Sequence, residues 1–240
     1  MAFKQNEVVL NYEVLSEKCA DILTKTVAEN PAAKIVLATG GSPLLGYRKF
    51  VQRVKETKLD VSKVTFIKLD EWLGLRPDDP ATCEHFIRQE ILNPLGISDS
   101  AYIGFDSRAS DPEAECTRIE KLLEALKPID LMVLGVGRNG HLGLNEPADY
   151  LYAGPHTIEL DEKTKQHAML TNTTETVQRG ITLGIKDILC SKTVLLLVSG
   201  EGKKEAYREI CKGTANTRVP ATMLNLHDNV ICIIEQEISK

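Results

Sequence analysis

The chain has 240 residues, of which 42% are hydrophobic, 26% charged and 5% aromatic, and this composition is typical of a globular protein with a core large enough to fold unaided. Asp and Glu number 34 against 29 Lys and Arg, so the net charge of -5 indicates no basic surface for nucleic acid or anionic lipid. The longest apolar runs, such as residues 194–198, are far shorter than the roughly 20 residues of a membrane helix. We therefore expect neither a nucleic-acid partner nor a membrane span.

The N-terminal sequence lacks the apolar stretch and the small-residue cleavage site of a secretory signal, which predicts a cytoplasmic protein. Its six cysteines are scattered, with no CxxC pair and no histidine at metal-ligand spacing. We expect reduced thiols that mostly fill the core, and we expect no metal site.

Short aliphatic runs alternate along the chain with amphipathic stretches, the pattern of βαβ units. Strands are expected at residues 34–38, 63–69, 130–136, 193–198 and 230–235, and helices at 12–30, 43–55, 83–92, 112–126, 179–190 and 202–212, whereas 144–176 is less regular. No flexible linker, low-complexity tract or internal repeat interrupts the series. The sequence predicts one α/β domain over residues 1–240, a doubly wound, mostly parallel, Rossmann-like sheet with helices on both faces. Ligands of such sheets bind at the carboxyl ends of the strands.

The loop after the first predicted strand contains Thr39, Gly40, Gly41 and Ser42, followed by Pro43. Two glycines let backbone N–H groups approach an anion, Ser42 can cap the next helix, and the helix dipole favours negative charge. We expect a phosphate site here, with a plain strand-to-helix turn as the alternative. A Walker A loop is excluded because no Gly-Lys-Thr/Ser follows at the required spacing.

Two adjacent acids, Asp70 and Glu71, follow the second predicted strand. Partial burial at a strand end raises the pKa of a carboxyl group towards values useful for proton transfer, so both are candidate acid/base groups. The alternative is that they solvate the strand end or cap a turn. Trp72, the only tryptophan, either lines the site or belongs to the core.

Residues 135–147 form a glycine-rich segment whose first six residues match GxGxxG. That motif opens a long helix in dinucleotide-binding folds, whereas here the loop formers Asn145 and Pro147 follow within a few residues. We therefore expect no dinucleotide site.

The same segment carries Asn139, His141 and Glu146, which a tight glycine loop can bring together. A carboxylate bound to one imidazole nitrogen fixes the tautomer and leaves the other nitrogen as an acid or base near neutral pH. We expect a catalytic histidine here, with a structural histidine as the alternative.

Basic side chains elsewhere are candidate ligands of an anionic substrate. Lys203, in the turn after the fourth predicted strand, could neutralise a phosphate on the first loop, and His167 belongs to the cationic stretch 163–167. For both residues, and for the ambiguous Arg179, the alternative is a solvated surface position. Glu71, Gly137, Arg138 and His167 are the remaining candidate substrate contacts.

Four ordered motifs together resemble the glucosamine-6-phosphate deaminase/isomerase family over about residues 30–236: residues 38–43, 69–72, 135–147 and 199–203. In residues 68–72, 139–147 and 179–189 the chain is most similar to the galactosamine-6-phosphate branch. Four motifs in the same order are far more specific than any one of them.

The resemblance implies an aldose-ketose isomerisation coupled to deamination, in which a 2-amino-2-deoxyhexose 6-phosphate and water give a ketohexose 6-phosphate and ammonia, without metal or nucleotide. By similarity, Asp70 carries the proton from C2 to C1, and His141, tuned by Glu146, opens the sugar ring. The phosphate would lie on the loop of residues 39–42, with Lys203 as counter-charge.

The chain departs from the glucosamine pattern in two places. Asn139 stands where those enzymes carry an aspartate, and an amide cannot accept a proton as a carboxylate does. Either Glu146 alone supports His141, or the difference marks another sugar such as the 4-epimer. The arginine that helps to bind phosphate in the family has no clear match, and Lys165 or His167 falls in its region.

Two other functions remain open from sequence. One is a 6-phosphogluconolactonase, although that family carries Asp-Gly-His rather than the Asn139-Gly140-His141 found here. The other is a sugar-phosphate sensor without catalysis, yet only about 33 residues precede the first predicted strand, and an acidic chain with no DNA-binding helix pair does not favour it. The sequence pattern does not determine the oligomeric state, and a homo-oligomer is compatible with it.

Overall fold

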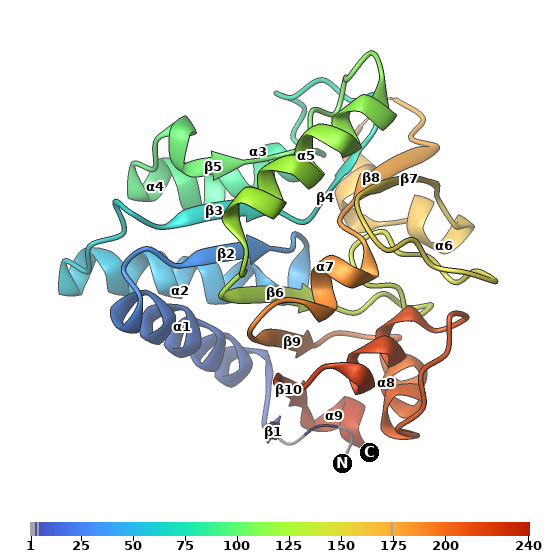
Figure 1. Cartoon of the computed structure of the whole chain (residues 1–240). Helices are drawn as coiled ribbons and strands as arrows, with labels where there is room; N and C mark the ends of the chain where they lie inside the picture. The colour runs from blue at the N-terminus through green and yellow to red at the C-terminus, as the bar shows by residue number, and fades with distance from the viewer. Residues whose placement is uncertain (1–2, 4, 174) are drawn as a thin grey trace.

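The computed structural model describes residue 3 and residues 5–173 and 175–240, and its centre is a seven-stranded sheet in which every neighbouring pair is parallel. Figure 1 shows this sheet crossing the molecule between helices. The strands, in spatial order, are β1 (Gln5–Val9), β10 (Val230–Glu235), β9 (Val194–Val198), β6 (Leu131–Gly135), β2 (Lys34–Leu37), β3 (Thr65–Lys68) and β5 (Tyr102–Ile103). All five predicted strands are confirmed, and so is the predicted doubly wound, mostly parallel sheet.

Helices cover both faces of this sheet, as the amphipathic stretches predict. The α-helices of the described residues are α1 (Tyr12–Glu29), α2 (Gly41–Thr57), α3 (Cys83–Ile87), α4 (Asn93–Leu95), α5 (Pro112–Leu126), α6 (Glu162–Lys165), α7 (Ile185–Leu189), α8 (Lys204–Cys211) and α9 (Gln236–Ser239). Shorter helical segments are a π-helical turn, Arg88–Leu92, and three 3-10 turns at Asp99–Ala101, Ala168–Asn172 and Pro220–Leu226.

Side chains along each strand alternate between two apolar layers, one on each face of the sheet. In β2, Ile35 and Leu37 pack with α1 and α2, whereas Val36 packs on the opposite face with residues of α5, α7 and α8. This alternation explains why the strands read as continuous apolar runs: both faces of a helix-covered parallel sheet are buried. Cysteines 19, 83, 116 and 232 are buried, while Cys190 and Cys211 are exposed.

A second, three-stranded antiparallel sheet stands beside the first, with the order β4 (Asp70–Trp72), β8 (Arg179–Thr182) and β7 (His156–Glu159). The predicted helix over 179–190 is therefore wrong in its first half, because residues 179–182 pair with strands on both sides and only Ile185–Leu189 are helical. A short run of buried residues fits a strand as well as a helix. Backbone pairing decides in favour of the strand, since Gly180 pairs with Trp72 on one side and Ile158 on the other.

No helix within the described part of the chain is both long and apolar enough to cross a membrane.

Candidate active site

A cavity of about 620 Å³ lies where the carboxyl ends of β2, β6 and β9 meet the start of β4. Its walls contain most of the predicted site residues: Thr39, Gly40, Gly41, Ser42, Asp70, Gly137, Arg138, Asn139, His141, His167 and Lys203. Glu71 and Glu146 are not part of its lining. The strand-end rule thus brings together loops that lie more than 160 residues apart in sequence.

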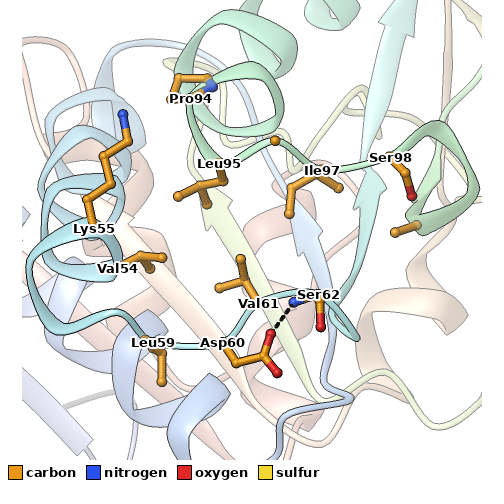
Figure 2. A pocket seen from close by; sticks show the side chains of 12 residues that line it. Val54, Lys55, Leu59, Asp60, Val61, Ser62, Pro94, Leu95, Ile97 and Ser98 are labelled. Atoms are coloured by element: carbon orange, nitrogen blue, oxygen red, sulfur yellow. Dashed lines mark hydrogen bonds between the residues drawn. The ribbon is translucent and has the colours of Figure 1, made fainter.

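A second hollow, of about 440 Å³, opens at the opposite edge of the sheet, before β3 and β5. Figure 2 shows its largely aliphatic lining, including Leu59, Val61, Leu95 and Ile97. The Asp60 carboxylate in its wall accepts a hydrogen bond from the Ser62 backbone N–H at 2.9 Å. None of the predicted site residues lies there, so we place the chemistry in the first cavity.

The glycine loop after β2 ends in a backbone conformation that favours glycine. Gly40 precedes α2 with φ 101°, and α2 begins at Gly41. Ser42 therefore lies inside the first turn and is not the helix cap, which corrects that prediction: no side chain caps α2, and the Ser42 hydroxyl accepts a hydrogen bond from Ser199 Oγ at 3.1 Å. The N–H groups at the start of α2 are left without a capping side chain, as an anion site requires.

Three basic side chains gather around this loop. Lys203 has its pKa lowered to about 8, because burial disfavours the charged amine and Arg138 adds repulsion. Burial also lowers the pKa of His167 to about 4, and electrostatic repulsion from His141, Lys203 and Arg138 contributes in the same direction. An anion bound among these groups would relieve that repulsion.

His167 presents its Nε2 side to the glycine loop. Its Nδ1 accepts a hydrogen bond from the Met169 backbone N–H at 3.3 Å, so the neutral ring carries its proton on Nε2. A Cβ at Gly40 would lie 3.6 Å from that nitrogen. Lys165, the other residue considered for this region, pairs with Glu162 at 2.7 Å and is outside the cavity lining.

Asp70 is the buried acid of the cavity. Its side chain is 8% exposed, and burial, with the neighbouring Glu71 carboxylate, raises its pKa to about 7. One weak hydrogen bond reaches it, from the Cys83 thiol, with Sγ 3.7 Å from Oδ1. A carboxyl group that is half ionised near neutral pH can both take up and release a proton.

Glu71 has a different environment, although it is the next residue. It is 0% exposed, and its two oxygens accept hydrogen bonds from the backbone N–H groups of Trp72, Cys83 and Glu84 and from Lys68 Nζ, all at 2.7–2.9 Å. Its carboxylate is thus committed to the protein, which leaves no position for the substrate contact considered from sequence.

His141 faces the cavity with one ring nitrogen held by a carboxylate. Nδ1 lies 3.3 Å from Glu146 Oε2 and 3.2 Å from the Thr164 hydroxyl. Because the carboxylate can only accept, the imidazole proton lies on Nδ1 and Nε2 is free to act as a base. Gly137 is required beneath the ring, since a Cβ there would lie 2.3 Å from Nε2.

Asn139 supports Glu146 in this arrangement. Its side-chain N–H donates to Glu146 Oε2 at 2.8 Å, and its Oδ1 accepts from the His141 backbone N–H at 3.2 Å. Burial raises the pKa of Glu146, but hydrogen bonds from His141, Thr164 and Asn139 outweigh it, and the net shift is downwards. Glu146 is thus the carboxylate on His141, and Asn139 holds it in place.

Sequence reasoning missed two neighbours of these groups. Thr164 lies on α6, inside the irregular stretch 144–176, and no motif marked it. For Cys83 the sequence predicts only a thiol that fills the core. Trp72 belongs both to the site and to the core, because it lines the cavity and packs in an apolar cluster with Leu75 and Leu160.

Within the described ranges, no group of three or more His, Cys, Asp or Glu side chains is placed to hold a metal ion.

Comparisons with known proteins identify the family of the chain. Residues 10–232 match the family described as glucosamine-6-phosphate isomerases/6-phosphogluconolactonase. A protein of Escherichia coli (strain K12) named "Putative deaminase AgaI" is 46% identical over 226 residues, covering 94% of this chain and 90% of the relative. A glucosamine-6-phosphate deaminase of Thermoanaerobacter sp. (strain X514) is 37% identical over 232 residues, covering 96% and 92%.

Solved structures extend the likeness. A monomeric glucosamine-6-phosphate deaminase superposes with a TM-score of 0.94 at 34% identity, covering 98% of both chains. The 6-phosphogluconolactonase of Trypanosoma brucei shares the fold, with a TM-score of 0.78 at 19% identity over 99% of this chain and 98% of that one. The family predicted from the four motifs is confirmed: the chain belongs to the glucosamine-6-phosphate isomerase/6-phosphogluconolactonase family.

Proposed function

We propose that this protein is an amino-sugar phosphate deaminase/isomerase. It converts a 2-amino-2-deoxyhexose 6-phosphate and water into a ketohexose 6-phosphate and ammonia, with galactosamine 6-phosphate preferred to glucosamine 6-phosphate. The observation that carries the proposal is one cavity with a buried acid, Asp70, whose pKa is raised to about 7, and a histidine held by a carboxylate. Relatives at 46% and 37% identity are named as deaminases.

The substrate phosphate binds at the start of α2. The backbone of residues 39–42 donates N–H groups, and Lys203 and Arg138 supply positive charge. Neutral His167 donates a hydrogen bond from Nε2 to the phosphate. It thereby replaces the phosphate-binding arginine of the family, which has no clear match in this chain. With the phosphate anchored there, the reacting carbons lie towards Asp70 and His141.

Ring opening is the first chemical step. Nε2 of His141 takes the proton of the anomeric hydroxyl and returns a proton to the ring oxygen, which breaks the bond from C1 to that oxygen and leaves an open-chain aldose. Glu146 accepts the Nδ1 hydrogen bond and stabilises the imidazolium formed during the transfer. Asn139 keeps Glu146 in position.

Isomerisation and deamination follow at C2. Ionised Asp70 removes the C2 proton while a proton of the substrate ammonium group passes to O1, which gives an enolamine. Asp70 then delivers its proton to C1, which leaves a protonated imine at C2. Water adds to the imine carbon, the bond from C2 to nitrogen breaks, and ammonia leaves with the keto group in its place. No electron acceptor is needed, and we propose that neither a metal nor a nucleotide takes part.

Residues from both sheets contribute to this one site, which supports a single catalytic domain over residues 1–240. Asp70 begins the small sheet, whereas Thr39 and Gly137 follow strands of the large one. We propose a cytoplasmic enzyme whose partner is a small sugar phosphate, with no nucleic-acid or membrane partner.

The test is ammonia release from galactosamine 6-phosphate and glucosamine 6-phosphate, measured side by side on protein treated with a chelator. We expect turnover of both sugars, a higher kcat/KM for the galacto epimer, and loss of turnover in His141→Asn. A higher kcat/KM for the gluco epimer would overturn the epimer preference while leaving the reaction intact.

The same protein is assayed with 6-phosphogluconolactone. Lactone hydrolysis without ammonia release from either amino sugar would replace the deaminase by the lactonase. Tight binding of the amino-sugar phosphates without any turnover would identify a sensor.

A further inference from the structure

The thiol of Cys83 lies between two residues of the cavity that come from different strands. Cys83 is the first residue of α3 and is 1% exposed. Its Sγ is 3.2 Å from the hydroxyl of Thr39, in the loop after β2, and 3.7 Å from Oδ1 of Asp70, at the start of β4. Both neighbours line the cavity, whereas Cys83 stands behind them.

The direction of these hydrogen bonds follows from the chemistry of the groups. Burial, together with the Glu71 and Asp70 carboxylates, raises the pKa of the Cys83 thiol well above its usual value, so the S–H remains protonated. An ionised carboxylate only accepts, so the single S–H hydrogen points to Asp70. The Thr39 hydroxyl then donates to the sulfur, and the chain of donors runs from Thr39 through Cys83 to Asp70.

The position of the sulfur is itself fixed by the backbone. The Cys83 N–H donates to Glu71 Oε1 at 2.9 Å, and the side chain of Thr82 caps α3 by accepting from the His85 N–H at 3.0 Å. The first turn of α3 is therefore attached to the strand that carries Asp70. These bonds fix the backbone that carries the thiol, and the contacts of the sulfur with Thr39 and Asp70 fix the side chain between them.

We propose that Cys83 is a positioning residue for the base: its S–H holds Oδ1 of Asp70, turns the other carboxylate oxygen towards C1 and C2 of the substrate, and ties that orientation to Thr39 of the phosphate loop. The inference rests on the proposed function for its kinetic consequence. Donation to the ionised form also favours the carboxylate over the neutral acid. Cys83 makes no contact with substrate and takes no part in bond making.

The direct test is the titration of Asp70 followed by ¹³C NMR of the labelled carboxyl carbons, with the Asp70 signal assigned by its absence in Asp70→Asn. In Cys83→Ala the lost donor raises the midpoint by about half a pH unit, the size expected for one weak hydrogen bond to a carboxylate. Cys83→Ser keeps an O–H donor and titrates closer to the wild type. Cys83→Val, which fills the space of the thiol without a donor, replaces the Ala variant if that protein does not fold.

The matched control is Cys232→Ala, which removes another buried thiol, on β10 and outside the cavity lining, and leaves the Asp70 midpoint unchanged. The kinetic readout is the acidic limb of the kcat/KM profile for the amino-sugar phosphate. It moves to higher pH with the NMR midpoint in Cys83→Ala, and kcat falls several-fold while KM changes less than twofold.

An Asp70 midpoint that is the same in the wild type, Cys83→Ala and Cys83→Val would overturn the inference. So would a shift in Cys83→Ser as large as that in Cys83→Ala. Because the NMR titration needs no turnover, it decides the role of Cys83 even if neither amino sugar releases ammonia, a result that would instead refute the proposed function.

Discussion

Asp70 and Glu71 are neighbours on one short strand, yet their carboxylates have opposite surroundings. Glu71 points into a closed cluster, where Lys68 Nζ also binds Glu84 Oε2 and the Phe105 carbonyl at 2.8 Å. Asp70 points into the cavity and receives one thiol hydrogen bond. Both acids are buried, so burial alone does not decide which of them is reactive.

The difference shows what hydrogen-bond donors do for a buried acid. A carboxylate with four donors has both oxygens bound and one orientation, whereas one with a single weak donor keeps a pKa governed by desolvation. Because successive residues of a strand point to opposite faces, one dipeptide supplies both a structural acid and a chemical one. We therefore expect the Lys68 side of β4 to contribute to stability, and we propose that the acid on the cavity side transfers the proton.

The largest expected effect is on turnover when the cavity-facing acid is neutralised. Asp70→Asn lowers kcat for ammonia release by about 10²–10⁴-fold, because the amide cannot take the C2 proton. The measurement is steady-state ammonia release at pH 8. An unchanged far-UV circular dichroism spectrum is the control, and turnover within tenfold of the wild type would assign the proton shuttle to another group.

Neutralising the other acid affects stability. Glu71→Gln leaves the buried charge of Lys68, which is 1% exposed, without its nearest partner and lowers the free energy of unfolding by about 3–5 kcal/mol. Urea denaturation measures the loss.

The exposed pair Lys25 and Glu29 provides the matched control, since Glu29→Gln changes stability by about 0–1 kcal/mol. If the two Gln variants lost equal stability, the closed cluster around Glu71 would not be the stabilising side of β4.

A smaller effect of opposite sign is expected for Asp70→Asn on stability. The folded-state pKa of about 7 lies above the reference value of 3.8, so the unfolded chain releases this proton first and the folded state is penalised as pH rises from about 4 to 7. Above pH 7 the variant is therefore more stable than the wild type, by about 2–4 kcal/mol. Thermal unfolding at pH 8 and pH 4 measures this gain, which disappears at pH 4.

The same advantage at both pH values would contradict this pKa-linked origin and point to better packing of the amide.

The smallest effect concerns the far end of the closed cluster. Tyr102 donates to Glu84 Oε2 at 2.7 Å, and Tyr102→Phe removes that bond at a cost of about 1 kcal/mol in unfolding free energy. We expect kcat to stay within twofold of the wild type. A larger fall in kcat with this small loss of stability would show that the two faces of β4 are coupled.

The large sheet could be predicted because its strands are buried on both faces and read as uninterrupted aliphatic runs. The strand β1 was missed, since its Gln5, Asn6 and Glu7 carry no such signal, and so were the short β5 and the whole small sheet. The sequence pattern predicts a loop at residues 70–72 and the start of a helix at residues 179–182. Their pairing is long-range, between segments more than 100 residues apart, and no local pattern encodes it.

Most of the predicted site residues do line the cavity, for a related reason: glycines, acids and a histidine that follow predicted strands meet at one edge of the sheet. The assignment of roles within it could not be complete. The family resemblance singles out Asp70, but no local pattern distinguishes it from Glu71, because their difference lies in which backbone N–H groups α3 presents to Glu71. Thr164 and Cys83 likewise gain their positions from the small sheet and from α3.

The residue at the junction of the two sheets is Leu69, whose N–H donates to the Leu37 carbonyl at 3.2 Å in the large sheet, while its own carbonyl accepts from the Leu183 N–H at 3.0 Å beside the small one. Opening of the small sheet therefore pulls on the peptide group that precedes Asp70. In hydrogen exchange, the Leu183 amide is released by the same opening that displaces the acid. Its protection therefore reports the free energy of the opening that displaces the acid.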